Sequence, residues 1–283
     1  MEFIFITMKT TKTLQTPEII EASVRSGSRF VLDSIVSNFN PITLSELDEH
    51  NLQERMDTKY LLDEALLPEI LDEIKDDYTI LQVAGRSVQP YLTLYYDTET
   101  YANYFAHHNG RRPRFKIRIR KYMNSNASFL EVKEKDRKDR TVKSRLQIND
   151  IANRLAPEHY QFISEVFPLG LVPLKPVIWN RFDRLTLVNM HSLERVTIDL
   201  GFNAYNQNGF ISWERLTIVE IKRGRCSLRS EFVQAIRKRY IKPVNFSKYC
   251  VSLALLTPEL KANRFKPNIE KIRLCLQRSM SYV

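Results

Sequence analysis

The chain has 283 residues, 43% of them hydrophobic, which is enough to bury a substantial core in one large domain or two ordinary ones. The 43 lysines and arginines against 33 aspartates and glutamates give a net charge of +10, which favours an anionic partner such as nucleic acid, a phosphate compound or an acidic membrane surface. No apolar run approaches the roughly 18 residues of a membrane-spanning helix, and three widely spaced cysteines without a CxxC pair argue against a zinc site and predict a reducing, cytoplasmic location.

The first part of the chain predicts an arm followed by alternating helices and strands. Residues 1–40 are rich in serine and threonine, and we expect a flexible N-terminal arm. Residues 43–50 predict a short helix, in which Thr43 and Glu46 can form a capping box. Residues 54–62 alternate as in a strand, and 63–77 have the apolar spacing of an amphipathic helix.

The remainder continues the same mixture of helices and strands. A strand at 91–98 is followed by a helix that Gly110 ends, and a β-hairpin joins "RFKIRIRKY" to residues 128–135. One or two helices are predicted within 149–168 and further helices at 228–240, 246–256 and 268–278, and strands are predicted at 177–188, 194–202 and 215–223. No linker divides the chain, so one α+β domain on an antiparallel sheet is the simplest interpretation.

The stretch "RPRFKIRIRKY" alternates basic and apolar residues without a break. On a strand, Arg114, Lys116, Arg118 and Arg120 share one face, opposite aliphatic and aromatic side chains. One such strand is ordinary solvated surface of an antiparallel sheet. The pattern recurs, however, in "FLEVKEK", "ERVTIDL", "TIVEIKR" and "RMDTKY". This recurrence favours a sheet that closes into a barrel, with the charged faces inside and helices outside.

A charged interior of this kind predicts an anionic ligand. Like charges about 5 Å apart repel by roughly 3 kcal/mol at an effective dielectric constant near 20. Glu131, Asp199 and Glu220 offset part of this repulsion, and a phosphate chain would offset the rest. Arginine forks and lysines bind phosphate, and carboxylates beside them suit Mg²⁺ or Mn²⁺. The chain has seven glycines and no GxxxxGK or GxGxxG motif, so phosphate binding would depend on side chains.

Eight motifs in order resemble the VTC domain, over roughly residues 50–255. They are "RMDTKYLL", "LYYDT" with "YFAHHNG", "KIRIRKY", "FLEVKEK", "RTVKSRL", "ERVTIDLGF", "IVEIKRG" and "NFSKYC". The VTC domain is the polyphosphate polymerase module of the vacuolar transporter chaperone complex and belongs to the triphosphate tunnel metalloenzymes. The resemblance implies an eight-stranded antiparallel β-barrel with flanking helices, spanning residues 41–260, with a C-terminal helix in 261–283 packed on the same domain.

The resemblance also implies an activity and a set of site residues. The enzyme would add the γ-phosphate of ATP to a growing polyphosphate chain, with Mn²⁺ or Mg²⁺ as cofactor. The implied catalytic phosphate contacts are Lys59, Arg118, Arg120, Lys133, Arg181 and Arg195. Lys143 or Arg145, with Lys248, would bind substrate, and the strand pattern adds Arg114, Lys116 and Lys222. Glu220 would hold the metal, with Glu131 as a second candidate.

Two departures from the related families bear on function. The resemblance places Arg55, Asp57 and Lys59 at the positions where hydrolytic members of the superfamily have the pattern Glu-x-Glu-x-Lys. This difference favours the polymerase branch. Asn245 stands where polymerase relatives often have a lysine. The alternatives are a triphosphate or tripolyphosphate hydrolase on the same scaffold, and a non-catalytic module that binds polyphosphate or inositol phosphates. We expect no nucleic-acid partner, and any coupled translocation would need a separate membrane protein.

Overall fold

The computed structural model describes residues 34–49, 55–167, 172–224 and 230–278. Most of the arm predicted for residues 1–40 lies outside these ranges. The part that is described packs on the domain, because Val36 and Phe39 are buried in the core. No helix in the described ranges is long and apolar enough to cross a membrane.

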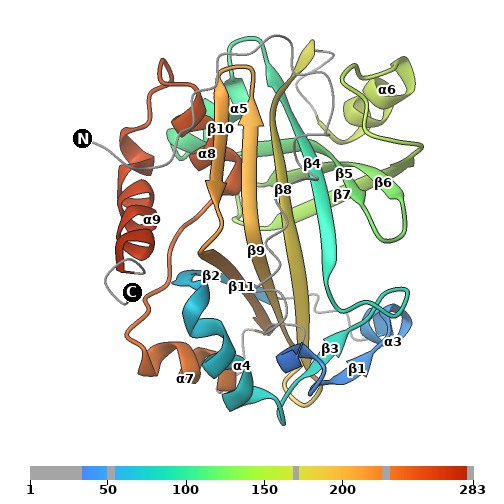
Figure 1. The fold of residues 1–283 in the computed structure, drawn as a ribbon. Helices are drawn as coiled ribbons and strands as arrows, with labels where there is room; N and C mark the ends of the chain where they lie inside the picture. The colour runs from blue at the N-terminus through green and yellow to red at the C-terminus, as the bar shows by residue number, and fades with distance from the viewer. Residues whose placement is uncertain (1–33, 50–54, 168–171, 225–229, 279–283) are drawn as a thin grey trace.

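Eight strands form a continuous antiparallel path in the order β2, β11, β9, β8, β4, β5, β6 and β7 (Figure 1). Their bounds are β2 (Arg55–Asp63), β4 (Gln89–Thr98), β5 (Arg114–Tyr122), β6 (Ala127–Lys135), β7 (Thr141–Ile148), β8 (Leu174–Asn189), β9 (Glu194–Asn206) and β11 (Leu216–Gly224). Three shorter strands extend the sheet beside this path, namely β1 (Asn40–Ile42), β3 (Thr79–Leu81) and β10 (Gly209–Trp213).

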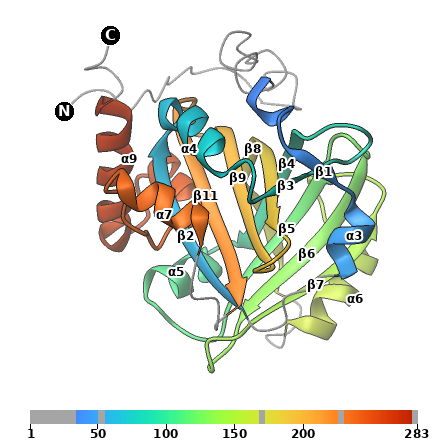
Figure 2. The same ribbon diagram turned by 90° about the horizontal axis from the view of Figure 1, so that it is seen from below.

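Helices surround the sheet, as Figures 1 and 2 show. They are α3 (Leu44–Glu49), α4 (Leu67–Ile74), α5 (Ala102–His108), α6 (Pro157–Val166), α7 (Glu231–Lys238), α8 (Lys248–Leu256) and α9 (Lys266–Arg278), with 3-10 turns at Glu64–Leu66 and Asn263–Phe265. The predicted α+β class, antiparallel sheet and flanking helices are therefore confirmed.

The predicted capping box at the start of α3 is also confirmed. The Thr43 N–H donates to the Glu46 carboxylate (2.8 Å), and the Glu46 N–H donates to the Thr43 hydroxyl (3.4 Å). Both groups would otherwise lack a helical partner at this end, so the reciprocal pair fixes where the helix begins.

The sheet curls strongly but is not closed by hydrogen bonds, which differs from the closed barrel expected. In the described ranges β2 pairs only with β11, and β7 only with β6. A physical reason is visible at β2, where the Val244 N–H from the segment between α7 and α8 donates to the Lys59 carbonyl (2.8 Å). That contact occupies part of the edge that β7 would need.

The outer face of the curled sheet is apolar and lies under helices. Alternate residues of β2, β8, β9 and β11, such as Leu62 and Val219, pack against α4 and α7 in one cluster. Alternate residues of β4, β5 and β6, such as Ile117, pack against α6 in another. Burial of these side chains fixes the register of these seven strands, because a slip of one residue would expose the whole apolar set. The charged residues are thereby directed to the opposite face.

Candidate active site on the inner face of the sheet

The charged faces of distant strands face one another across the curled sheet. Lys116 on β5 and Lys133 on β6 are direct neighbours in the hairpin. Lys133 also lies close enough to Glu220 on β11 and to Lys59 on β2 for their charges to influence its pKa. Because β6 and β11 are far apart along the sheet path, this proximity arises from curling. We call this charged surface the inner face.

The strand registers place nearly all the predicted site residues on the inner face. They are Lys59, Arg114, Lys116, Arg118, Arg120, Glu131, Lys133, Lys143, Arg145, Arg195, Glu220 and Lys222. Lys248 reaches the same surface from the first turn of α8, where it contacts Asp199. The alternation seen on single strands thus becomes a single cationic surface.

The Glu220 carboxylate forms ion pairs with two lysines, one on β2 and one on β11. One carboxylate oxygen lies 2.6 Å from the Lys59 ammonium, and the other lies 2.5 Å from the Lys222 ammonium. Burial alone would raise the pKa of Glu220, but the charges of Lys222 and Lys59 lower it well below its ordinary value. The carboxylate is therefore ionised at neutral pH.

Glu131 forms a second buried ion-pair cluster. Its side chain is 1% exposed and lies 2.6 Å from the Arg118 guanidinium, and Lys143 on β7 also contacts it. Against the opposing effect of burial, the charges of Arg118, Arg120 and Lys143 lower the pKa of Glu131. Arg118 donates a further hydrogen bond to the Tyr95 hydroxyl (3.1 Å), so its guanidinium is held on two sides.

Asp199 forms the third cluster, with a fork from Arg184. The Arg184 Nε and Nη2 atoms lie 2.6 and 2.8 Å from the two carboxylate oxygens, and Lys248 contacts the same carboxylate. Burial would raise the pKa of Asp199, but Arg184 and Lys248 lower it to about 2. The cluster joins β8, β9 and α8 through charge-assisted hydrogen bonds.

An aromatic floor lies beneath three of the cations. The rings of Tyr91 and Phe182 are stacked with centroids 5.4 Å apart. Arg120 and Arg184 each lie 5.1 Å from the centre of the Tyr91 ring, and Lys248 lies 4.8 Å from that of Phe182. Cation–π attraction at this distance adds to the Asp199 ion pairs of Arg184 and Lys248 in holding the three charges close together.

A row of lysines crosses β5, β6 and β7 with little compensation. Lys116, Lys133 and Lys143 lie opposite one another in the strand registers. Within the described residues, Lys116 and Lys133 have no carboxylate at ion-pair distance. Burial lowers the pKa of Lys116, and it lowers that of Lys133 to about 8. Opposed like charges are destabilising, so this row would gain from a bound anion.

Arg181 is the predicted site residue that the structure does not bring to this surface. It lies opposite Leu92 in the register, and Leu92 packs with Tyr205 on the outer side. Phe182 and Arg184 face inward instead, because they alternate with Arg181 along β8, and Phe182 pairs with the inward-facing Tyr91 of β4. The pairing shift beside Arg181 adds its extra residue to β9, between Leu200 and Asn203, and leaves the alternation of β8 unchanged.

Arg195 and Arg145 lie at the periphery of the inner face. An Arg195 Nη2 atom lies 3.5 Å from the Leu47 carbonyl on α3. The Arg145 guanidinium lies 5.1 Å from the centre of the Phe129 ring. Both residues belong to the surface, but neither lies in the three carboxylate clusters.

Arg184, Phe182 and Tyr95 belong to the site although sequence reasoning did not select them. Phe182 and Arg184 alternate with Arg181 on β8, and the motif match selected Arg181, which faces the other way. Tyr95 looked like a packing aromatic. Its hydroxyl accepts from Arg118, and Arg118, Arg120 and Lys116 outweigh burial and lower its pKa.

The donor set fits a divalent cation only if phosphate supplies further ligands. The described residues contain no group of three or more histidine, cysteine, aspartate or glutamate side chains placed to hold a metal. Mg²⁺ is commonly bound by one or two carboxylates together with substrate phosphates. Glu220 meets that requirement, being ionised and surrounded by lysines that would also attract the phosphates.

Solved structures that align with this chain share little sequence with it. A protein from Hippeastrum described as an adenylyl cyclase with a dominant triphosphatase activity is 12% identical, with 69% of this chain and 94% of that chain covered and a TM-score of 0.42. A protein from Bacillus halodurans that is described as an adenylate cyclase is 9% identical, with 69% of this chain and 94% of that chain covered and a TM-score of 0.44. For the RNA triphosphatase of S. pombe these values are 13%, 95%, 97% and 0.25. TM-scores this low do not establish a common fold.

The assignment to a family comes from the sequence. No curated protein matches the chain. The VTC domain family matches residues 54–257, a range that begins at β2 and ends just after α8 and so includes every strand of the inner face. Because the match spans well over half of the sequence, the chain belongs to the VTC domain family.

Proposed function

We propose that this protein is a metal-dependent polyphosphate polymerase, which transfers the γ-phosphate of ATP to a growing polyphosphate chain on the inner face. The observation that carries the proposal is the gathering of cations from β2, β5, β6, β7, β8, β11 and α8 on one surface. A surface so rich in buried positive charge suits a ligand with several closely spaced negative charges. Membership of the VTC domain family supports polyphosphate as that ligand.

The reaction requires a new bond and the loss of an old one at the same phosphorus atom. A terminal oxygen of the polyphosphate chain would attack the γ-phosphorus of ATP, and the bond from that phosphorus to the β,γ-bridging oxygen would break, releasing ADP. The attacking oxygen is already anionic, so no general base is needed. Catalysis would therefore depend on positioning and on neutralising charge, as in other phosphoryl transfers.

The residues of the inner face divide these tasks. Arg118 and Arg120 can bind phosphate oxygens in pairs, and each is already held by an aromatic contact. The row of Lys116, Lys133 and Lys143 would bind successive phosphates of the chain. Glu220 with phosphate oxygens would hold Mn²⁺ or Mg²⁺, and the bound metal would supply further charge neutralisation. Arg181 has no part in this proposal because it lies on the opposite face.

The direct test is to incubate the purified protein with ATP and Mn²⁺ and to analyse the products by gel electrophoresis with a polyphosphate stain. We expect a ladder of chains that disappears on treatment with a polyphosphatase, together with release of ADP. Release of free phosphate from tripolyphosphate without chain growth would replace the proposal with a hydrolase. Binding of tripolyphosphate without turnover, with either metal, would replace it with a binding module.

A further inference from the structure

We propose that Tyr249 and Asp97 are positioning residues that hold α8 so that Lys248 stays on the inner face. The activity measurements below depend on the proposed polymerase function, whereas the binding measurements do not. The inference comes from a buried contact chain that begins at Asp97 and leads to two cations of the site.

Asp97 ties the starts of two helices to the end of β4. Its side chain is fully buried and accepts hydrogen bonds from the backbone N–H groups of Thr98 (2.8 Å), Asn103 (2.9 Å) and Tyr104 (2.9 Å). The same carboxylate accepts a hydrogen bond from the Tyr249 hydroxyl on α8. Three backbone donors from α5 and its approach therefore fix the carboxylate, and the carboxylate fixes Tyr249.

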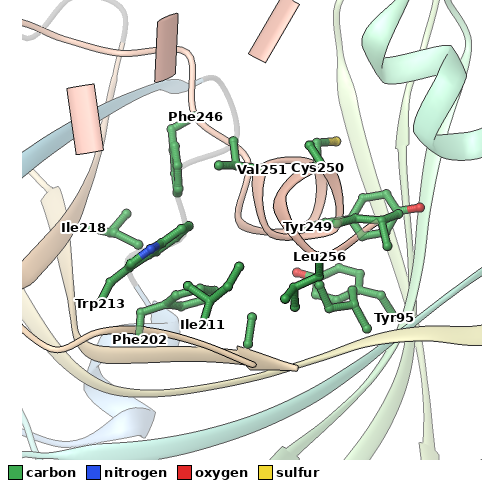
Figure 3. Close-up of a cluster of buried hydrophobic side chains, with 14 of the residues drawn as sticks. Tyr95, Phe202, Ile211, Trp213, Ile218, Phe246, Tyr249, Cys250, Val251 and Leu256 are labelled. Carbon is green, nitrogen blue, oxygen red and sulfur yellow. The ribbon is translucent and has the colours of Figure 1, made fainter. Parts of the chain in front are cut away.

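Tyr249 also contacts the site through its ring. It stacks on Tyr95 with the centroids 5.0 Å apart, and Figure 3 shows the two rings beside α8. The Tyr95 hydroxyl is the acceptor for Arg118. One side chain of α8 thus contacts the anchor at Asp97 and the ring that supports Arg118.

The position of Lys248 depends on this anchor because the two residues are consecutive in the first turn of α8. Ser247 caps the helix by accepting the Cys250 N–H (3.3 Å), and Lys248 projects to Asp199 and the Phe182 ring. A small rotation or shift of α8 would move the ammonium group of Lys248 away from both. The hydroxyl of Tyr249 resists that movement without touching the substrate.

The test begins with Tyr249→Phe, which keeps the ring and its stacking and removes only the bond to Asp97. We expect the Kd for tripolyphosphate, measured by calorimetry, to rise about tenfold, as after Lys248→Ala. The matched control is Tyr104→Phe, because that buried hydroxyl donates to the Lys261 carbonyl (3.1 Å), away from Lys248. The control should bind with the Kd of the unchanged protein.

The double variant distinguishes positioning from general loss of stability. If Tyr249 acts through Lys248, then Tyr249→Phe with Lys248→Ala should bind no more weakly than Lys248→Ala alone. The inference would be overturned if the double variant showed the product of the two single increases in Kd. It would also be overturned if Tyr249→Phe bound tripolyphosphate as tightly as Tyr104→Phe. If Tyr249→Phe does not fold, Ser247→Ala provides the second test, since it loosens the same helix end and should show the same dependence on Lys248.

Activity measured on the same variants separates this inference from the proposed function. We expect the KM for polyphosphate primer to rise in Tyr249→Phe with a smaller change in kcat. If the unchanged protein makes no polymer, but the single and double variants show that the effect of Tyr249 on binding depends on Lys248, the polymerase proposal would be contradicted and the positioning role supported. Polymer formation with independent effects at the two positions would contradict the positioning role alone.

Discussion

Replacing Arg118 with alanine is expected to abolish polymer formation and to destabilise the domain by about 3 kcal/mol. Arg118 is one of two cations on the buried Glu131 carboxylate, with contacts of 2.6 and 2.7 Å. Without Arg118, the Glu131 carboxylate contacts only the Lys143 ammonium, and the Tyr95 hydroxyl loses the hydrogen bond that Arg118 donates. A loss of this size in a domain of this length corresponds to a fall in Tm of roughly 10 °C. Calorimetric unfolding and the polyphosphate gel measure the two effects.

Two further variants separate charge pairing from phosphate binding. Lys121→Ala removes an ion pair on the same strand, but its partner Asp150 is largely exposed, so the expected loss is less than about 1 kcal/mol. Arg118→Lys keeps a cation beside Glu131 and should recover most of the stability. Because lysine lacks the planar fork, polymer formation should remain at least about tenfold reduced. A fully stable and fully active Arg118→Ala variant would contradict both roles.

Replacing Glu220 with glutamine should have opposite effects on catalysis and on binding. We expect polymer formation to fall by about 100-fold or more, because the proposed metal loses its protein ligand. Without metal, however, tripolyphosphate should bind several-fold more tightly, because the negative charge between Lys59 and Lys222 is gone. Steady-state kinetics with Mn²⁺ and calorimetry in the presence of a chelator measure the two outcomes.

Asp57→Asn is the matched control for Glu220. Asp57 lies on the neighbouring strand β2, opposite Lys222, and the substitution removes a negative charge from the same face. The Asp57→Asn variant should bind tripolyphosphate more tightly, and its polymer formation should still be activated by Mn²⁺. Equal loss of activity in both variants would show that Glu220 has no special relation to the metal.

Most of the strand faces could be predicted from alternation alone. The two strands of the Arg114–Tyr122 and Ala127–Lys135 hairpin have the predicted faces, because aliphatic residues at every second position must all be buried together. The same reasoning predicted the inward direction of Glu220 on β11. A strand with two chemically distinct faces carries that information in its own sequence.

Features that depend on contacts between distant segments could not be predicted in the same way. Arg181 was selected because its motif matched, whereas its outward direction follows from the pairing of β8 with β4, which the motif does not contain. The contact of Tyr249 with Asp97 joins residues 152 positions apart in the sequence. The open edge at β2 depends on the approach of Val244, which lies between two helices.

The placement of α8 illustrates how the two kinds of information combine. The sequence "NFSKYC" predicted a helix with a lysine that reaches the phosphates. The structure adds what holds that helix in place, namely the Ser247 cap, the Asp97 anchor and the stacked rings of Tyr95 and Tyr249. Residues that contact a ligand can be found from motifs, whereas residues that position them depend on packing.

The most direct test of the central claim is a crystal structure of the protein grown with tripolyphosphate. The claim is that the inner face between β2 and β7 binds a chain of phosphates. We expect the phosphate groups to lie within hydrogen-bond distance of Arg118, Lys133 and Lys222. Phosphate groups bound only on the outer helices, with the inner face unchanged, would contradict the claim.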